Sequence, residues 1–251
     1  MTNGAMKLSA KLVLPLAVLL SSGVSLAQDS ASPAPSKVDG AAMVSLAPLR
    51  IEMDGPDRAA TLRVFNPSGR AIGVQVRAFG WKQESGQDVF SAANDVMVSP
   101  SIITIDPGET QIFRVVRKDQ PAEGERRYRV AVDQLPDPEL TRAGEATARI
   151  RFTIPMFVDR AAAAPAQLAW TLGEDGLTVT NSGGQTVRMV NLDLTGPQAG
   201  KIPVTLNGLY YVQGGSVLNW PLEGACPSGP INITASIDGE DINAQVANTC
   251  G

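Results

Sequence analysis

Short segments in which apolar and polar residues alternate recur along most of the chain, and they constrain its fold more than any other feature. In one of them, every second position is apolar or small: Ala146, Ala148, Ile150, Phe152 and Ile154. A period of two is that of a β-strand, because successive side chains point to opposite faces of a sheet, whereas a helix repeats every 3.6 residues. The chain is therefore predicted to be all-β.

Turn-forming residues separate these segments. Asp106-Pro107-Gly108 stands between an apolar run and the alternating residues 112–117, and the chain holds 24 glycines and 18 prolines. Proline presets one turn angle and glycine accepts a positive φ. Pro48 predicts a sheet edge or a break in the first strand. About seven such segments lie within the first ~120 residues after residue 42, as in an immunoglobulin-like sandwich.

The alternation of apolar and polar residues is interrupted once, by the small residues and proline of "DRAAAAPAQ" (Asp159 to Gln167), and then resumes. The later alternating segments are 177–181, 187–194, 209–212 and 231–238. We therefore expect two immunoglobulin-like β-sandwich domains, an N-terminal one at 42–159 and a C-terminal one at 160–251.

The N-terminus has the pattern of an export signal. Lys7 and Lys11 precede the apolar core at 12–20, and Ser25-Leu26-Ala27 is a small-residue cleavage site. The apolar run is shorter than the ~20 residues that span a bilayer. A signal peptide is predicted at 1–27 and, from its polar and Pro-rich composition, a disordered leader at 28–41.

The chain has no histidine, and its two cysteines are Cys226 and Cys250. In an exported protein such a pair predicts a disulfide. A zinc site and histidine-dependent nucleophilic catalysis are excluded, and no Gly-rich phosphate loop is present. We therefore expect neither an enzyme nor a cofactor or metal site. The net charge of −4 and pI near 5.0 argue against nucleic acid as a partner.

Four segments carry a family resemblance: "VSLAPLRIEMDG" at 44–55, "LRVFNPSGRAIGVQVRAFGW" at 62–81, "VSPSIITIDPGETQIFRVVR" at 98–117 and "ERRYRVAVDQLP" at 125–136. With the export signal, they resemble the periplasmic chaperones of the chaperone–usher pilus pathway. The ending "RFTIPMFV" is similar to the branch that serves spore-coat-U-like secreted pili. The resemblance implies two sandwiches joined at an angle.

The resemblance also implies a mechanism and partners. Pilus subunits of this pathway lack their last strand, and the chaperone completes them with a strand of its own before they reach an outer-membrane usher. The lending strand corresponds to 145–154 here, and its candidate groove-fillers are Ala146, Ala148, Ile150, Phe152 and Ile154. Phe152 and Ile154 could instead pack inside the chaperone. Because "GEATA" is small, groove filling could be shallow or shifted toward the preceding "PDPELTRAG" loop.

Two sets of charged residues carry over from the family. Arg50 and Arg151 correspond to the basic pair that grips the subunit's C-terminal carboxylate, with Arg149 as a rival to Arg151. Glu125, Arg160 and Asp238 correspond to a buried network at the domain joint, although Pro155 occupies the family's linker-arginine position.

Two other classes of protein share part of this pattern. A secreted pilus subunit or adhesin shares the sandwich pattern, but the leader lacks the alternating apolar residues of a donor strand. A carbohydrate-binding module needs an aromatic platform, and Trp81 and Trp220 are more simply strand-end residues that bury a ring.

Overall fold

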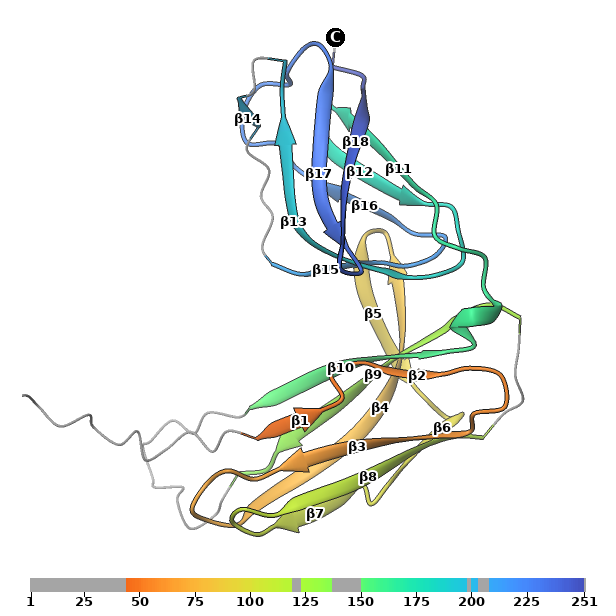
Figure 1. Ribbon diagram of the computed structural model, residues 1–251, viewed down its shortest axis with the longest axis vertical. Coiled ribbons are helices and arrows are strands. Elements are labelled where there is room, and N and C mark those ends of the chain that lie inside the picture. Colours follow the sequence, from red (N-terminus) through yellow and green to blue (C-terminus); the bar gives the residue numbers. More distant parts are fainter. Residues whose placement is uncertain (1–43, 119–122, 137–149, 198–199, 203–207, 251) are drawn as a thin grey trace, which may run out of the picture. The chain divides into compact units, whose positions relative to one another are not determined.

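The computed structural model describes residues 44–118, 123–136, 150–197, 200–202 and 208–250 (Figure 1). The predicted signal peptide and leader lie outside these residues. Within them the regular elements are β-strands and a short 3-10 helix, η2 (Arg160–Ala162), and no helix is long and apolar enough to cross a membrane. The predicted all-β fold of two sandwiches is confirmed.

The first sandwich packs a four-stranded sheet against a six-stranded one. The four-stranded sheet has the order β1 (Ser45–Ala47), β3 (Ala59–Phe65), β8 (Thr110–Arg117), β6 (Val96–Ser99). The six-stranded sheet has the order β2 (Ile51–Met53), β10 (Arg151–Val158), β9 (Arg126–Gln134), β4 (Ile72–Glu84), β5 (Gln87–Ala92), and β7 (Ile102–Ile105) also pairs with β4. Alternate residues of both sheets, such as Leu62, Val64, Phe113 and Val130, form the core between them.

The turn Asp106-Pro107-Gly108 carries the chain from one sheet to the other. It joins β7, which pairs with β4, to β8, which pairs with β3. Gly108 has the positive φ of 72° that the sequence predicted. The buried Asn66 side chain donates to the carbonyls of Ile105 and Asp106, which fixes the turn against β3.

The first strand is broken at Pro48, as the sequence predicted. Before the break β1 pairs with β3, and after it β2 runs parallel to β10 in the other sheet. The chain therefore changes sheet between Ala47 and Ile51. Because β2 is only three residues long, it covers only the last residues of β10.

The second sandwich is built from the later strands around its own core. Its strand order is β14 (Lys201–Ile202), β13 (Val187–Thr195), β17 (Ile231–Ile237), β18 (Glu240–Asn248), β11 (Leu168–Gly173), β12 (Gly176–Asn181), β16 (Val217–Trp220), with β15 (Tyr210–Val212) also paired with β13. The four alternating segments of the sequence correspond to β12, β13, β15 and β17. Trp220 is buried at the end of β16, as predicted.

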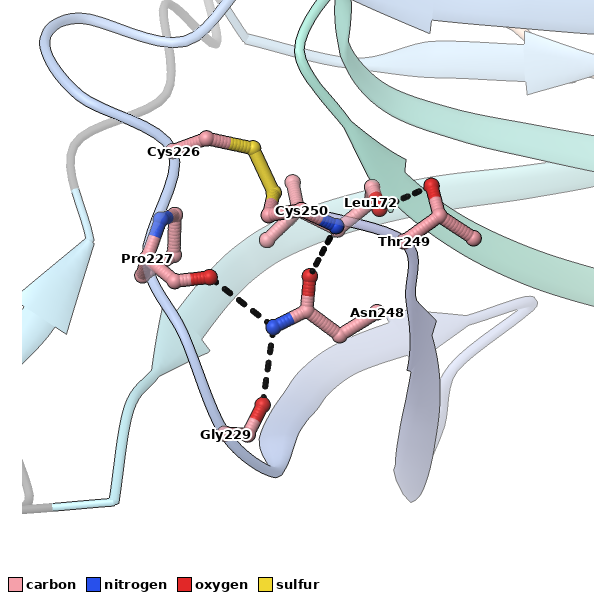
Figure 2. The surroundings of a disulfide bond; sticks show 7 residues. All are labelled: Leu172, Cys226, Pro227, Gly229, Asn248, Thr249 and Cys250. Carbon is pink, nitrogen blue, oxygen red and sulfur yellow. Dashed lines mark hydrogen bonds between the residues drawn. A yellow bond between two sulfur atoms is a disulfide. The ribbon is translucent and has the colours of Figure 1, made fainter.

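The predicted disulfide joins Cys226 to Cys250 across a sequence separation of 24 residues (Figure 2). The Asn248 side chain donates to the carbonyls of Pro227 and Gly229, and its oxygen accepts from the Cys250 N–H at 3.0 Å. The bridge and these hydrogen bonds tie the end of β18 to the loop that precedes β17.

Candidate functional site

The first half of β10 has an open edge. On one side, all eight residues from Arg151 to Val158 pair with β9. On the other side, β2 pairs only with Met156, Phe157 and Val158. Among the described strands, none pairs with Arg151–Pro155 on that side. The open edge follows from the break at Pro48, because the residues that could have extended β2 pair with β3 instead.

The backbone groups that face outward on this edge follow from the ladder. Gln134 donates its N–H to the carbonyl of Ile150 at 3.0 Å. In an antiparallel pair only alternate residues point their N–H and C=O groups at the partner strand. The groups of Ile150, Phe152 and Ile154 therefore point toward β9, and those of Arg151 and Thr153 point to the open side. Pro155 has no N–H, so donor groups on this edge end at Thr153.

Successive side chains of β10 point to opposite faces of the sheet, and those of Phe152 and Ile154 face the core. Ile154 is 2% exposed and lies in the core of its own sandwich, and Phe152 is half-buried against that core. Ile154 is thus unavailable to fill a partner's groove, which corrects one of the two interpretations left open by the sequence. Ile150 is partly exposed, whereas Ala146 and Ala148 lie outside the described residues.

Arg50 and Arg151 lie at opposite ends of the open edge. Arg50 directly precedes Ile51, which pairs with Met156, so Arg50 is level with Pro155. Arg151 is four residues earlier on β10, about 13 Å away along the strand at 3.3 Å per residue. Their joint binding of one carboxylate therefore stays a prediction, which requires both side chains to reach along the strand toward each other. Arg149, the rival residue, lies outside the described part of the chain.

The two arginines also have different partners. Arg50 is 2.5 Å from Glu52 and 3.5 Å from Asp238, and its guanidinium lies 4.7 Å above the Phe157 ring. Arg151 binds Asp133, which also accepts from Arg77 at 2.8 Å. Burial raises the pKa of Asp133, but the hydrogen bonds from Arg151 and Arg77 outweigh it and hold this pKa below its usual range.

An open cleft of about 740 Å³ adjoins the edge. From the first sandwich it is lined by the β1–β2 connection, the β4–β5 turn, Arg129 on β9 and residues 152–155 of β10. From the second it is lined by Arg188, Leu209, Tyr210, Tyr211 and Leu218. The cleft thus runs from the unpaired backbone of β10 to an apolar surface of the second sandwich.

Glu125, Arg160 and Asp238 meet as the family resemblance implied. The Glu125 side chain is fully buried and accepts from Arg160 Nη1 at 2.6 Å, and Arg160 Nη2 lies 3.4 Å from Asp238. Glu125 also accepts from the backbone N–H of Thr186 at 2.9 Å. Because Thr186 precedes β13, this carboxylate joins the first sandwich to the second.

The sequence did not identify Arg127 as a member of this network. Arg127 Nε donates to Glu125 at 2.8 Å, and its Nη2 donates to the Gly184 carbonyl at 2.9 Å. A signal was present, because Glu125 and Arg127 are two positions apart in an extended segment and share a face. Thr186 had no comparable signal, since its contact with Glu125 joins residues 61 positions apart.

A second set of contacts between the sandwiches consists of two glutamine side chains and an arginine stacked on aromatic rings. Gln83 and Gln213 each accept the other's backbone N–H through the side-chain oxygen, both at 3.0 Å. The Arg129 guanidinium lies 3.7 Å above the Trp81 ring and 4.7 Å above the Tyr211 ring. Burial lowers the pKa of Arg129 from its usual value. The sequence predicted correctly that the Trp81 ring is buried, but Trp81 lies within β4 and not at its end, and the stack was not predicted.

The described residues contain no cluster of three His, Cys, Asp or Glu side chains that could hold a metal ion. The site offers unpaired backbone groups, an apolar surface and arginine side chains to a partner.

Comparison with protein families gave one match, over residues 43–163, to the family described as pili and flagellar-assembly chaperone, PapD N-terminal domain. This range contains all four segments that carried the resemblance seen in the sequence, and the match confirms that resemblance. Comparison with curated proteins found no match.

Several solved structures have the same fold. The chain is similar to a structure from the CsuC–CsuE chaperone–tip adhesion subunit complex of Acinetobacter baumannii, with 19% identity, a TM-score of 0.65, and coverage of 83% of this chain and 100% of the other. A structure from the Salmonella enterica SafA pilin–SafB chaperone complex matches with 20% identity, a TM-score of 0.61, and coverage of 81% and 96%. The E. coli chaperone DraB matches with 19% identity, a TM-score of 0.57, and coverage of 82% and 96%.

Proposed function

Because residues 43–163 belong to the family of pili and flagellar-assembly chaperones, we propose that this protein is a periplasmic chaperone that binds pilus subunits through the open edge of β10. The observation that carries the proposal is the unpaired backbone of Arg151 and Thr153 beside an open cleft. Two of the similar structures come from complexes of a chaperone with a pilus or tip subunit.

The chemistry of the edge suits a partner that lacks a strand. An incomplete sandwich exposes unpaired N–H and C=O groups together with a hydrophobic groove, and it aggregates when left uncovered. A strand added along β10 exchanges hydrogen bonds with Arg151 and Thr153 and covers the partner's edge. No nucleotide is needed, since the subunit leaves when a strand of its neighbour replaces β10 at the outer-membrane usher.

Within this proposal Arg50 contacts the subunit's C-terminal carboxylate, because it lies at the end of the open edge beside β2. A guanidinium can meet a carboxylate with two parallel, charge-assisted hydrogen bonds. Arg151 stands at the outer end of the edge and binds Asp133. Glu125, Arg160, Arg127 and Asp238 hold the two sandwiches in the arrangement that forms the cleft.

Co-expression with candidate pilus subunits in a periplasm tests the function. The wild-type protein is expected to hold a subunit in a soluble 1:1 complex in the periplasm. Thr153→Pro removes the last donor of the open edge and should abolish the complex, whereas Thr153→Ala should retain it. If the subunits stay soluble without this protein, the proposed function is wrong.

A further inference from the structure

Two leucines on the walls of the cleft are unusually exposed. Leu49, in the β1–β2 connection, is 71% exposed, and Leu209, just before β15, is 47% exposed. Both line the cleft that residues 152–155 of β10 also line. A large apolar side chain that stays in water gains stability when a partner covers it, and several such side chains around one cleft mark a binding surface.

The lending strand itself offers few apolar side chains to a partner. Ile154 belongs to its own core and Phe152 is half-buried there. The first two residues of the predicted apolar face are alanines, which bury little area. A subunit groove that pairs with β10 therefore needs apolar contacts from elsewhere, and Leu49 and Leu209 are the exposed large apolar residues that line the adjoining cleft.

We propose that Leu49 and Leu209 bind apolar side chains of the same pilus subunit that pairs with the open edge of β10. The proposal rests on the proposed function. The small residues of the lending strand bury little apolar area. The inference adds that the β1–β2 connection and the second sandwich supply much of the apolar contact with the subunit. The second sandwich is then part of the binding surface.

The cleft favours an extended strand that carries an acidic side chain. A strand satisfies the outward N–H and C=O groups of Arg151 and Thr153, which are continuous with the cleft. The charged residues on the cleft walls are Asp88, Arg129 and Arg188, so the cleft is positive by one charge. Arg129 makes no ion pair with a carboxylate in the described part of the chain, so an acidic side chain of the subunit is accommodated beside it.

The test uses the full-length protein and a subunit that the wild type holds in a soluble complex. Leu49→Ser, Leu209→Ser and the double variant are compared with Ile112→Ser, because Ile112 is 54% exposed on β8 and does not line the cleft. Each leucine variant should weaken the complex about tenfold or more, as expected for loss of one covered leucine. Ile112→Ser should bind like the wild type.

The melting temperatures of the free variants should stay within about 2 °C of the wild type, since all three side chains are exposed. If the wild type holds the subunit and the leucine variants bind as tightly as Ile112→Ser, this inference is overturned while the proposed function stands. If the wild type holds no subunit, the proposed function itself fails. A reduced affinity on Leu49→Ser and Leu209→Ser with unchanged melting supports the inference.

Discussion

The buried carboxylate of Glu125 accepts the backbone N–H of Thr186 at 2.9 Å, so a side chain of the first sandwich holds the start of a strand of the second. The same carboxylate also binds Arg160 and Arg127. A single residue therefore links the two sandwiches and the short helix between them.

Replacing Glu125 should disturb this link. Glu125→Ala leaves Arg160 and Arg127 without their buried counter-charge, and loss of one partner of a buried ion pair costs about 3–5 kcal/mol. We expect a lower melting temperature and a broader distribution of domain orientations in small-angle scattering. Glu109→Ala is the control, because Glu109 is exposed beside the turn before β8. An unchanged scattering profile and melting temperature would contradict the role of Glu125.

Asp159 should matter for stability more than exposed acidic residues do. Its carboxylate is 2.7 Å from Arg117, and both side chains are almost fully buried. Asp159→Asn leaves a buried guanidinium without a full counter-charge, which should cost about 3 kcal/mol. The residue has a φ of 57°, a conformation that asparagine also tolerates, so the backbone is not strained by the substitution. The loss includes the hydrogen bond from Arg126 to the second carboxylate oxygen, at 2.9 Å.

Urea unfolding measures this difference. The control is Asp193→Asn, which breaks the exposed pair with Lys201 and should cost less than about 1 kcal/mol. Equal losses in the two variants would show that burial of the Arg117–Asp159 pair adds nothing to stability.

The pKa of Asp133 gives a pH-dependent prediction. Because this pKa is below its usual value in the folded protein, the Asp133 carboxylate stabilises the fold above a pH of about 4, where the unfolded carboxyl is already ionised. The stabilisation is lost as pH falls through the lower, folded-state pKa. Asp133→Asn should therefore destabilise by up to about 1 kcal/mol at pH 7 and by almost nothing at pH 2. Unfolding at the two pH values checks this, and an equal loss at both would refute it.

The disulfide should stabilise the second sandwich. Its sequence separation of 24 residues corresponds to about 3 kcal/mol in the chain-entropy model. The double variant Cys226→Ser/Cys250→Ser should lose about this much, measured by urea unfolding. Hydrogen exchange should place the loss in β17 and β18 and leave the first sandwich protected. Loss of protection spread equally over both sandwiches would be the contrary result.

Periodicity predicted many of the strands, because alternation reports which residues face a core, but it missed β11, β14, β16 and β18 of the second sandwich. It could not assign Ile154 to a partner's groove or to the chaperone's own core, since residues of one face have the same spacing in either case. In the structure Ile154, on β10 between β2 and β9, is buried in the core of the first sandwich.

Strand register sets the separation of Arg50 and Arg151. They are about 100 residues apart in sequence, and their separation in space depends on the parallel pairing of Ile51 with Met156, which no local pattern reveals. The Glu125, Arg160 and Asp238 contacts were anticipated only through the family resemblance. The exposed Leu49 and Leu209 had no signal, because an exposed leucine and a buried one look alike in a β-rich sequence.

Hydrogen exchange at four adjacent amides of β10 tests the central claim most directly. The amides of Phe152 and Ile154 point toward β9 and should be protected in the free protein, whereas those of Arg151 and Thr153 should exchange rapidly. Binding of a pilus subunit should then protect Arg151 and Thr153. If the Thr153 amide exchanges as slowly as that of Ile154 in the free protein, or stays unprotected in the complex, β10 does not lend its open edge.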